Sequence, residues 1–356
     1  MPEDVHERPE MAATIYAVAD RAKVSIATVS RVLAGSTGVT ENTRRRVVAA
    51  VDDLDYLPSG AARSLAARRH HTLGLVLPEL RGPYYAELLA GFETRASELR
   101  QGVMLVIAED TRTSGQAVRS LATRVDGFAV LGVDPDELKA GTKKVVLIAG
   151  DDRPDVEVIA TENLDSSRRL TNHLLGHGRS RLLFVGDPGA AQDVRARYEG
   201  FVAAHRAAGL EPADPVLTRF RESDGHDVAE RIIHGDLHAD ALVCGNDELA
   251  LAIIAGLIRA GVEVPDDIAV VGWDDVMTAR YVRPGLTTVR QPVRDVGALA
   301  ADRLHLLVMG AARERQRHVL PTEVIIRGTC GCPENPSTTS DLDLPIPAPP
   351  QKVRVR

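Results

Sequence analysis

Cysteine is scarce in this chain of 356 residues, which contains only three. Three cysteines cannot supply the disulfide framework that stabilises many small secreted domains. Two of them form the motif Cys330-Gly331-Cys332, which could indicate metal binding or a redox switch. A structural zinc site needs four ligands, and the sequence has no second cysteine pair. We therefore interpret the motif as incidental and expect neither a bound metal nor a cofactor.

Long apolar segments are also missing from the sequence. No run of about 18 apolar residues, the length of a membrane-spanning helix, occurs in it. The first eleven residues, MPEDVHERPEM, are acidic and polar and lack the apolar core of a signal peptide. We expect a soluble, cytoplasmic protein that makes no contact with membranes.

Signatures of catalysis and of nucleotide binding are absent as well. The sequence shows no phosphate-binding loop and no Ser/His/Asp signature. The segment Gly186-Asp187-Pro188-Gly189 follows a predicted strand but is not a dinucleotide fingerprint. A glycosidase-like enzyme could use Asp247, Asp274 and Asp275 as acid and base, but it would leave the N-terminal segment without a role. We predict that the protein is not an enzyme.

Positive charge is concentrated near the N-terminus of a chain whose net charge is −7. Residues 14–70 hold nine Arg or Lys against five acidic residues, a charge of +4, so the remainder carries −11. A basic segment attracts phosphates locally, while an acidic body discourages indiscriminate binding. The length and a hydrophobic content of 44% also allow a large core and more than one domain.

Residues 14–33, TIYAVADRAKVSIATVSRVL, are predicted to form two short helices joined by Lys23-Val24-Ser25, which is a helix-turn-helix. Thr14 and Ser25 are suitable N-caps for the two helices. Apolar residues at helical spacing give each helix one buried face, made of Ile15, Val18, Ala19 and Ala22 in the first and of Val29, Val32 and Leu33 in the second.

The opposite face of the second helix is made of Ile26, Ala27, Ser30 and Arg31. Such a face suits a helix whose N-terminal end enters the major groove of DNA, where Arg31 could contact a guanine edge through two hydrogen bonds. The alternative is an ordinary pair of core helices, with Arg31 as a solvated surface residue.

A third helix is expected from its cap, Thr40, to about Leu54. Its buried face is predicted to hold Val47, Val48 and Val51. Pro58 then interrupts the chain, and residues 59–67 have a helical composition but are too few for an isolated helix to be stable in water. We expect this segment to be disordered without a partner.

From Thr72 onward, apolar runs of strand length alternate with helical segments. The predicted strands are Leu73–Leu77, Val103–Ala108, Gly127–Leu131, Val145–Ala149, Leu182–Gly186, Val216–Phe220, Ala241–Cys244 and Ile268–Gly272. The predicted helices are Tyr84–Leu99, Ser166–His177, Val194–Ala208, Asp247–Ala260 and Val293–Met309. This alternation indicates parallel sheets covered on both faces. About 260 residues of it exceed one sheet core, so we expect two similar lobes.

Polar and aromatic residues follow several of these strands. Tyr84 and Tyr85 come after the first strand, Asn246 after the seventh, and Trp273 with Asp274 after the eighth. Because ligands of parallel α/β folds bind at the carboxyl ends of the strands, these residues are candidates for a ligand site.

Three ordered motifs near the N-terminus carry a resemblance: VSIATVSRVL in the second helix, VTENTRRRV at the start of the third and YLPSGAARSL after it. With them the sequence resembles the lactose-repressor/galactose-repressor (LacI/GalR) family of bacterial transcription regulators, and a weaker similarity continues to about Gly328. Ala34 departs from the family pattern, where Asn is usual, and so does Gly60, where a better helix former is usual. Gly60 should make the helix expected at residues 59–67 more dependent on DNA.

The resemblance implies an α/β protein with an N-terminal three-helix helix-turn-helix domain and a hinge helix, followed by a two-lobed body like the periplasmic binding proteins, with parallel sheets. The expected boundaries are 14–58 for the helix-turn-helix domain, 59–71 for the hinge helix and linker, and 72–330 for the body. The first lobe would cover about 72–163 and 293–320, and the second about 164–289 and 321–330. The tail, 333–356, is rich in Pro, Ser and Thr and is expected to be disordered.

The resemblance also implies which residues contact DNA. They are Ser25, Ile26, Ala27, Thr28, Ser30 and Arg31 in the second helix, with Arg63 and Leu65 in the hinge. Paired hinge helices of a dimer in this family each insert a leucine into the minor groove at the central base step, and this role falls on Leu65. The alternative is a linker leucine packed against the next domain.

Effector contacts in the family fall on Tyr84, Tyr85, Asp193, Arg197, Phe220, Asn246, Trp273 and Asp274 of this sequence. Aromatic faces stack on sugar or base rings, and an Arg/Asn/Asp set suits the paired hydroxyls of a sugar. The alternatives are ordinary core packing for the aromatic residues and a helix N-cap for Asp274.

These expectations describe a DNA-binding transcription regulator, foremost a repressor that binds a palindromic operator as a homodimer and is released by a small effector, a sugar or sugar derivative. One alternative is a corepressor-dependent repressor that responds to a nucleobase or another metabolite. Another is a solute-binding protein without a DNA function, which would account for the body but not for residues 14–65.

Overall fold

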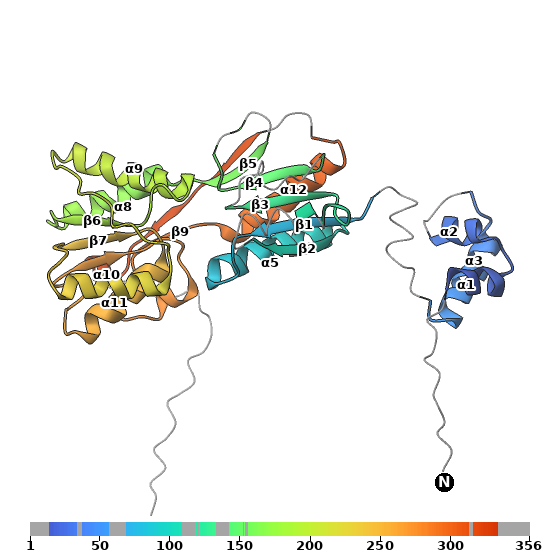
Figure 1. The fold of residues 1–356 in the computed structure, drawn as a ribbon, viewed down its shortest axis with the longest axis horizontal. Helices are drawn as coiled ribbons and strands as arrows, with labels where there is room; N and C mark the ends of the chain where they lie inside the picture. The colour runs from blue at the N-terminus through green and yellow to red at the C-terminus, as the bar shows by residue number, and fades with distance from the viewer. Residues whose placement is uncertain are drawn as a thin grey trace, which may run out of the picture. The chain divides into compact units, whose positions relative to one another are not determined.

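The computed structural model describes residues 14–33, 38–56, 69–108, 118–119, 121–132, 142–151, 153, 156–312 and 316–333 (Figure 1). The chain divides into two compact units, one of residues 1–72 with 124–126 and the other of the remaining chain. The predicted hinge helix with Arg63 and Leu65 lies outside the described residues, and so does the predicted disordered tail from residue 334.

The N-terminal unit contains three helices, α1 (Ile15–Ala22), α2 (Ile26–Leu33) and α3 (Glu41–Asp53), as predicted. Val18, Val29 and Val47 are fully buried at the centre of their shared core. The prediction for Val48 is wrong, because 47% of this residue is exposed. One residue in a helix is a rotation of about 100°, which turns Val48 away from the buried stripe that begins at Val47.

Each of these helices begins with the side-chain cap that the sequence predicts. The hydroxyl oxygens of Thr14, Ser25 and Thr40 accept hydrogen bonds from backbone N–H groups three residues later, at 3.3, 3.2 and 3.4 Å. Lys23 ends α1 in a left-handed conformation, with φ of 53°. Arg46 of α3 donates to the carbonyl oxygens of Ala22 and Lys23, which fixes the turn between α1 and α2. The helix-turn-helix is therefore held by caps and by a side chain from α3.

The first lobe of the body is built on a six-stranded sheet. Its strands are β1 (Thr72–Leu77), β2 (Gly102–Ile107), β3 (Gly127–Leu131), β4 (Lys144–Ile148), β5 (Glu157–Thr161) and β10 (Arg317–Leu320), in the spatial order β10-β5-β4-β3-β1-β2. Neighbours from β1 through β3, β4 and β5 to β10 pair in parallel. Helices α5 (Gly82–Glu98) and α12 (Val293–Val308) pack against each other and contribute Phe92 and Leu304 to the core under the sheet.

The second lobe is built on the parallel strands β6 (Leu182–Val185), β7 (Ala241–Cys244) and β8 (Ala269–Val271), in that spatial order. Its helices pack in two pairs, α8 (Leu164–Gly176) with α9 (Gln192–Ala207) and α10 (Glu222–Ile233) with α11 (Asp247–Arg259). An antiparallel pair, β9 (Thr288–Arg290) and β11 (Glu323–Ile325), and the short helical turns η1 (Met277–Arg280) and η2 (Gly328–Cys330) complete it. Figure 1 shows the two helix pairs on opposite faces of the strands.

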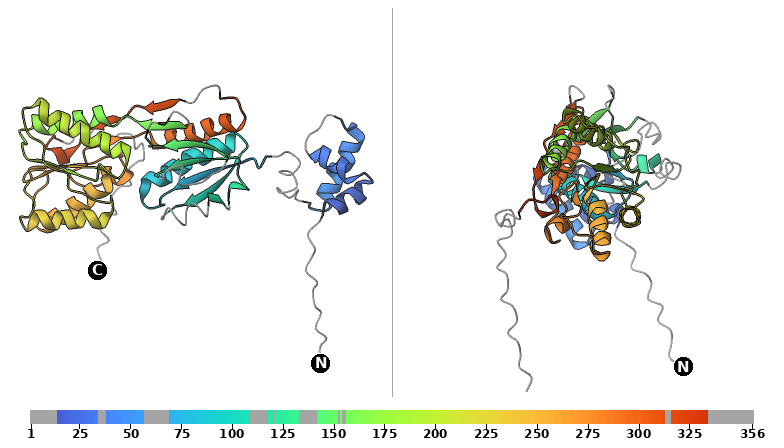
Figure 2. Two further views of the ribbon diagram at one scale, coloured as in Figure 1. Left: turned by 45° about the horizontal axis from the view of Figure 1, so that its top comes forward. Right: turned by 90° about the vertical axis from the view of Figure 1, so that its left-hand side faces the viewer.

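The chain crosses between the two lobes three times, after β5, after β9 and after β10 (Figure 2). Side chains join these crossings. The Thr161 hydroxyl donates to the amide oxygen of Gln291 at 2.6 Å, and the Thr322 hydroxyl donates to the carbonyl oxygen of Glu162 at 3.0 Å. Any movement of one lobe against the other must therefore bend these segments.

The α/β alternation was predictable from the sequence, but several individual elements were not. Seven of the eight predicted strands and all five predicted helices of the body are found, with ends that differ by no more than two residues. The predicted strand Val216–Phe220 is wrong, because only Val216 pairs with a strand residue and Phe220 has a left-handed φ of 63°. Sequence missed β5, β9, β10, β11 and α10. Among the missed strands, β9 and β11 have only three residues, and α10 opens with polar residues and a glycine that hide its apolar period.

Among the described helices, none is long and apolar enough to cross a membrane.

Candidate functional site

A cavity of about 350 Å³ in the body is lined by residues of both lobes. The first lobe supplies the start of α5 and the residues after β3 and β4, and the second supplies the start of α9 and the segments after β7 and β8. Seven of the eight predicted effector residues line this cavity, namely Tyr84, Tyr85, Asp193, Arg197, Phe220, Asn246 and Asp274. The volume lies near the lower end of the range for small-molecule pockets.

The apolar wall comes from the first turn of α5. Tyr84 and Tyr85 stand edge to face, with ring centroids 5.5 Å apart. Burial, with the carboxylates of Asp193 and Asp274 nearby, raises the pKa of Tyr84 above its ordinary value. Burial and Glu79 do the same for the pKa of Tyr85. Both rings therefore keep a protonated hydroxyl at the edge of a flat apolar face.

Three hydrogen bonds fix the guanidinium of Arg197 in the cavity wall. Its guanidinium donates to Asn163 Oδ1 at 2.8 Å, to the carbonyl oxygen of Gly245 at 2.7 Å and to Asp193 Oδ2 at 3.0 Å. Only 5% of Arg197 is exposed. Three of its five N–H donors are directed at these acceptors, so the plane of the group is fixed before a ligand arrives.

Trp273 does not line the cavity, although it was predicted to contact the effector. Its ring is 1% exposed in the core of the second lobe, and the guanidinium carbon of Arg197 lies 4.6 Å from the ring centroid. Side chains of successive strand residues point to opposite faces, and the sequence does not show which face Trp273 takes. Trp273 therefore contacts Arg197 and does not reach the cavity where a ligand contact was predicted.

Asp274 follows β8 in an unusual backbone conformation. Its φ is 117° and that of Asp275 is 57°, both in the left-handed region. Gln291 donates to Asp274 Oδ1 at 2.6 Å. Burial raises the pKa of Asp274 to about 7, although Arg197 and the hydrogen bond from Gln291 act in the opposite direction. Asp274 caps no helix here, because Val276 is the N-cap of η1.

Asn246 is the N-cap of α11 and therefore has a structural role as well. Its Oδ1 accepts from the backbone N–H of Leu249 at 3.0 Å, and its Nδ2 donates to the carbonyl oxygen of Phe220 at 3.4 Å. These two bonds bring the apolar ring of Phe220 and the amide of Asn246 to the same part of the cavity wall.

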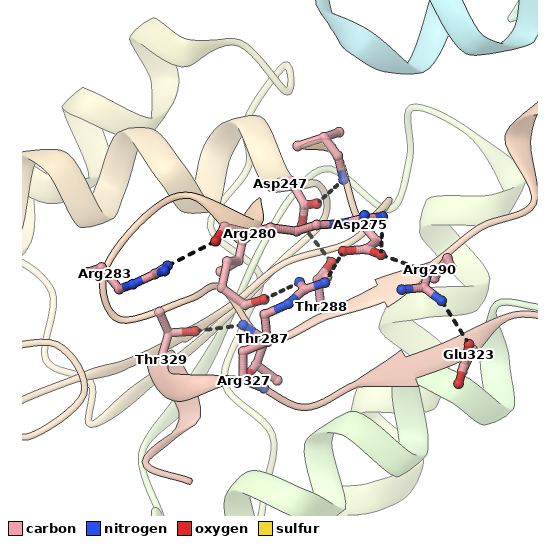
Figure 3. A network of polar contacts seen from close by, with 12 residues as sticks. Asp247, Asp275, Arg280, Arg283, Thr287, Thr288, Arg290, Glu323, Arg327 and Thr329 are labelled. Carbon is pink, nitrogen blue, oxygen red and sulfur yellow. Dashed lines mark hydrogen bonds and ion pairs between the residues drawn. The ribbon is translucent and has the colours of Figure 1, made fainter. Parts of the chain in front are cut away.

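Two buried carboxylates beside the cavity belong to a polar network of the second lobe (Figure 3). Asp247 accepts from the Thr288 hydroxyl at 2.6 Å and from the backbone N–H of Val276 at 2.9 Å. Asp275 accepts from Arg290 at 2.7 Å and from Arg327 at 2.6 Å. These contacts tie β9 and the C-terminal segment to the loop that carries Asp274. These contacts favour a structural role for Asp247 and Asp275 over a role as the acid and base of an enzyme.

Several cavity residues were not predicted from the sequence. Glu79, Arg81, Glu248 and Gln291 line the cavity, and Asn163 positions Arg197 from outside it. Gln291 and Asn163 stand at two of the crossings between the lobes. Gln291 could have been predicted as a polar residue directly after a strand, but strand β9 was not predicted from the sequence.

The outer face of α2 forms the candidate nucleic-acid surface. Ser25, Ile26, Ala27 and Arg31 are exposed, and Thr28 and Ser30 are half-buried. The Ser25 hydroxyl is also engaged as the N-cap and lies 2.9 Å from the Thr28 hydroxyl. Tyr16 of α1, which was not predicted as a contact, is 70% exposed. This small polar face with one arginine has the composition that major-groove helices need.

Comparisons with known proteins identify both parts of the chain. Residues 14–59 match the model of the bacterial regulatory proteins of the lacI family, and residues 171–330 match a periplasmic binding protein-like domain. The ribose operon repressor of Escherichia coli (strain K12) is 32% identical over 330 residues, which cover 89% of this chain and 99% of that repressor. The chain belongs to the LacI family of bacterial regulatory proteins. The fold and function class expected from its motifs are thereby confirmed, and this LacI-family protein is a DNA-binding transcription regulator.

Two solved structures of transcription regulators are similar to this chain. The Lac repressor dimer bound to operator and the anti-inducer ONPF is 25% identical with a TM-score of 0.80. The regulator CelR in complex with cellobiose is 28% identical with a TM-score of 0.68. Each alignment covers 89% of this chain and 99% of the compared chain.

Proposed function

We propose that this LacI-family protein is a cytoplasmic repressor that binds a palindromic operator as a homodimer and is released when a neutral sugar or sugar derivative enters the cavity. The observation that carries the proposal is the pairing of fixed polar groups with flat apolar rings. Arg197 and Asp274 offer a donor and an acceptor on one wall, and Tyr84 and Tyr85 offer apolar faces. A sugar presents this combination of paired hydroxyls and an apolar ring face.

The charge of the lining supports a neutral ligand. Four acidic residues, Glu79, Asp193, Glu248 and Asp274, face the cavity against two arginines, Arg81 and Arg197. Arg197 is already paired with Asp193. A phosphorylated sugar or another anion would meet net negative charge in a poorly solvated space, which costs binding energy.

The relatives support the same ligand class. One of them is the repressor of a ribose operon, and a structural neighbour, CelR, holds cellobiose. The corepressor alternative, with a nucleobase as effector, is supported by the aromatic wall, since bases also stack on tyrosine. We also propose that the ligand is bound without being converted, because Asp247 and Asp275 are engaged in structural contacts.

An effector can change DNA affinity only by binding one arrangement of the lobes more tightly than another. Cavity residues come from both lobes, and Gln291 joins the Asp274 loop to Thr161 at a crossing. We infer that closure around the ligand shifts the first lobe relative to its partner in the dimer. We expect the helices predicted for residues 59–67 then to separate and melt, so that operator binding weakens.

A thermal-shift screen of the full-length protein tests the ligand class. The panel holds neutral monosaccharides and disaccharides, their phosphate esters, and nucleobases. A ligand at about 100 times its Kd adds roughly 2.7 kcal/mol of stability, and we expect only neutral sugars to raise Tm. The variant Arg197→Ala should lose this response, while Arg206→Ala, an exposed arginine on the same helix, should keep it. A response to nucleobases alone would contradict the sugar proposal.

A further inference from the structure

Four potential metal ligands meet at the C-terminal end of α8, although the sequence predicted no metal site. His173 and His177 come from α8, and Cys330 and Cys332 come from the end of η2 and the residues after it. Their ligand atoms all lie within 4.8 Å of one another. The sequence analysis did not find this cluster. The two histidines that complement the cysteine motif lie more than 150 residues earlier in the chain.

The distances within this cluster match a tetrahedral ion. Cys330 Sγ lies 3.3 Å from His173 Nε2, and Cys332 Sγ lies 3.6 Å from His173 Nε2 and 3.3 Å from His177 Nε2. With Zn–S bonds of about 2.3 Å and Zn–N bonds of about 2.0–2.1 Å, a tetrahedral zinc ion holds sulfur and nitrogen ligands about 3.6 Å apart. The three sulfur–nitrogen distances given above are thus within about 0.3 Å of this value, and the remaining ligand-atom pairs lie within 4.8 Å.

Local structure explains how four residues converge. His173 and His177 are four apart in a helix, so their side chains lie on one face, and their rings are in contact with centroids 4.7 Å apart. Gly331 adopts a φ of 102°, which L side chains rarely take. This turn directs both cysteine thiols toward α8. Cys330 is fully buried in the core of the second lobe, while His177 is exposed.

We propose that His173, His177, Cys330 and Cys332 form a Cys2His2 zinc site that fastens the C-terminal segment to α8. Two thiolates and two imidazoles are a donor set that selects zinc over hard cations such as Mg²⁺ and Ca²⁺. On binding, each cysteine releases one proton to solvent, and each histidine coordinates as a neutral imidazole through Nε2. Four protein ligands close the coordination sphere, so the site is structural and not catalytic.

The fastened segment also supports the effector cavity. It carries Arg327, which holds the Asp275 carboxylate, and Thr329, whose hydroxyl oxygen accepts from the backbone N–H of Thr287 at 2.9 Å. Asp275 in turn adjoins Asp274 of the cavity wall. Zinc at the end of α8 would therefore stabilise the second lobe, including the loop that bears Asp274.

Metal analysis of the full-length protein, purified under reducing conditions, tests this site. We expect about one zinc per chain and, after replacement by Co²⁺, the intense visible absorption of a tetrahedral cobalt–thiolate centre. His177→Ala and Cys332→Ser each remove one ligand at a partly or fully exposed position, and each should retain less than about a tenth of the wild-type zinc. The matched control is His234→Ala, which removes another exposed histidine at a helix C-cap and should retain wild-type zinc.

Thermal unfolding provides a second readout that does not depend on DNA binding. Added zinc should raise the Tm of the chelator-treated wild type and of His234→Ala, and should not change the Tm of His177→Ala. The proposal is overturned if the wild type takes up neither zinc nor cobalt. It is also overturned if His177→Ala and Cys332→Ser bind as much zinc as the wild type. A Cys330–Cys332 disulfide that persists under reducing conditions with zinc present would overturn it as well.

Discussion

The guanidinium of Arg197 lies over the indole of Trp273, with 4.6 Å between its carbon and the ring centroid. The two residues belong to different elements, α9 and the segment after β8. Trp273 is buried and Arg197 is held by three hydrogen bonds, so the pair connects the core of the second lobe to the cavity wall. Trp273 thus supports Arg197, a residue of the cavity wall, without lining the cavity itself.

Trp273→Phe should weaken effector binding even though Trp273 does not reach the cavity. The smaller ring attracts the guanidinium less strongly, so the free energy of effector binding should weaken by up to about 2 kcal/mol, which would raise Kd by up to about thirtyfold. Isothermal titration measures this change. Phe201→Leu, a substitution in the same buried cluster, controls for general loss of packing. Equal effects of the two variants on Kd would mean that the Trp273 contact with Arg197 has no specific role.

Asp274 should make the stability of the protein depend on pH. Burial raises the pKa of Asp274 in the folded state to about 7 from an ordinary value of 3.8, so the folded protein binds this proton more tightly than the unfolded chain. The free energy of unfolding contributed by this group is therefore fully present below about pH 4 and is lost as pH rises through about 7, by up to about 4 kcal/mol.

Urea unfolding of the wild type and Asp274→Asn between pH 5 and 8 measures this dependence, with pH values chosen on either side of about 7. The asparagine variant does not titrate, so its stability relative to the wild type should increase with pH. A difference that is constant across this range would show that Asp274 does not titrate there.

Arg31→Ala should reduce sequence-specific DNA binding with little effect on folding. Arg31 is exposed at the end of α2, and a bidentate contact to a guanine edge contributes about 1–3 kcal/mol of discrimination. Specific affinity should fall about five- to 150-fold in a gel shift. Arg21→Ala, which removes another exposed arginine, should weaken specific and non-specific binding equally and slightly. If Arg31→Ala behaves in the same way, α2 does not contact bases through Arg31.

Leu65→Ala tests the hinge wedge that the sequence predicts. Loss of a leucine from the minor groove removes the DNA bend but leaves α2 and its phosphate contacts intact. Specific affinity should fall by about 1–3 kcal/mol per hinge, while salt-dependent non-specific binding barely changes. Affinity and DNA bending can be measured together by gel shift with permuted operator fragments. A variant that binds and bends operator normally would rule out the wedge, and one less stable as free protein would place Leu65 in a core.

Periodicity and capping were sufficient to predict the helix-turn-helix and most of the body. Apolar spacing located α1 and α2, and Thr14, Ser25 and Thr40 marked the helix starts, because these signals are local in sequence. The positions of cavity residues after strands followed from the general rule for parallel sheets. Four residues that this rule marked, Tyr84, Tyr85, Asn246 and Asp274, line the cavity. Asp193, Arg197 and Phe220, which also line it, were predicted from the family resemblance.

Contacts between distant segments were not predictable in the same way. The burial of Trp273 depends on which face of β8 it leaves, and the role of Gln291 depends on two crossings that meet in space. The meeting of His173 with Cys330 requires α8 and the C-terminal turn to be packed side by side. Each of these features is set by tertiary structure and has no period or motif within its own segment.

Operator binding measured with and without effector tests most directly whether the cavity controls the DNA-binding domain. Fluorescence anisotropy of a labelled operator, at one fixed salt concentration, gives the affinity of the wild type, Arg197→Ala and Arg206→Ala. A saturating neutral sugar should weaken operator binding by the wild type and by Arg206→Ala about five- to 150-fold. Arg197→Ala should bind operator normally and show no response. A response of Arg197→Ala equal to that of the wild type, or tighter operator binding in the presence of the sugar, would contradict release through this cavity.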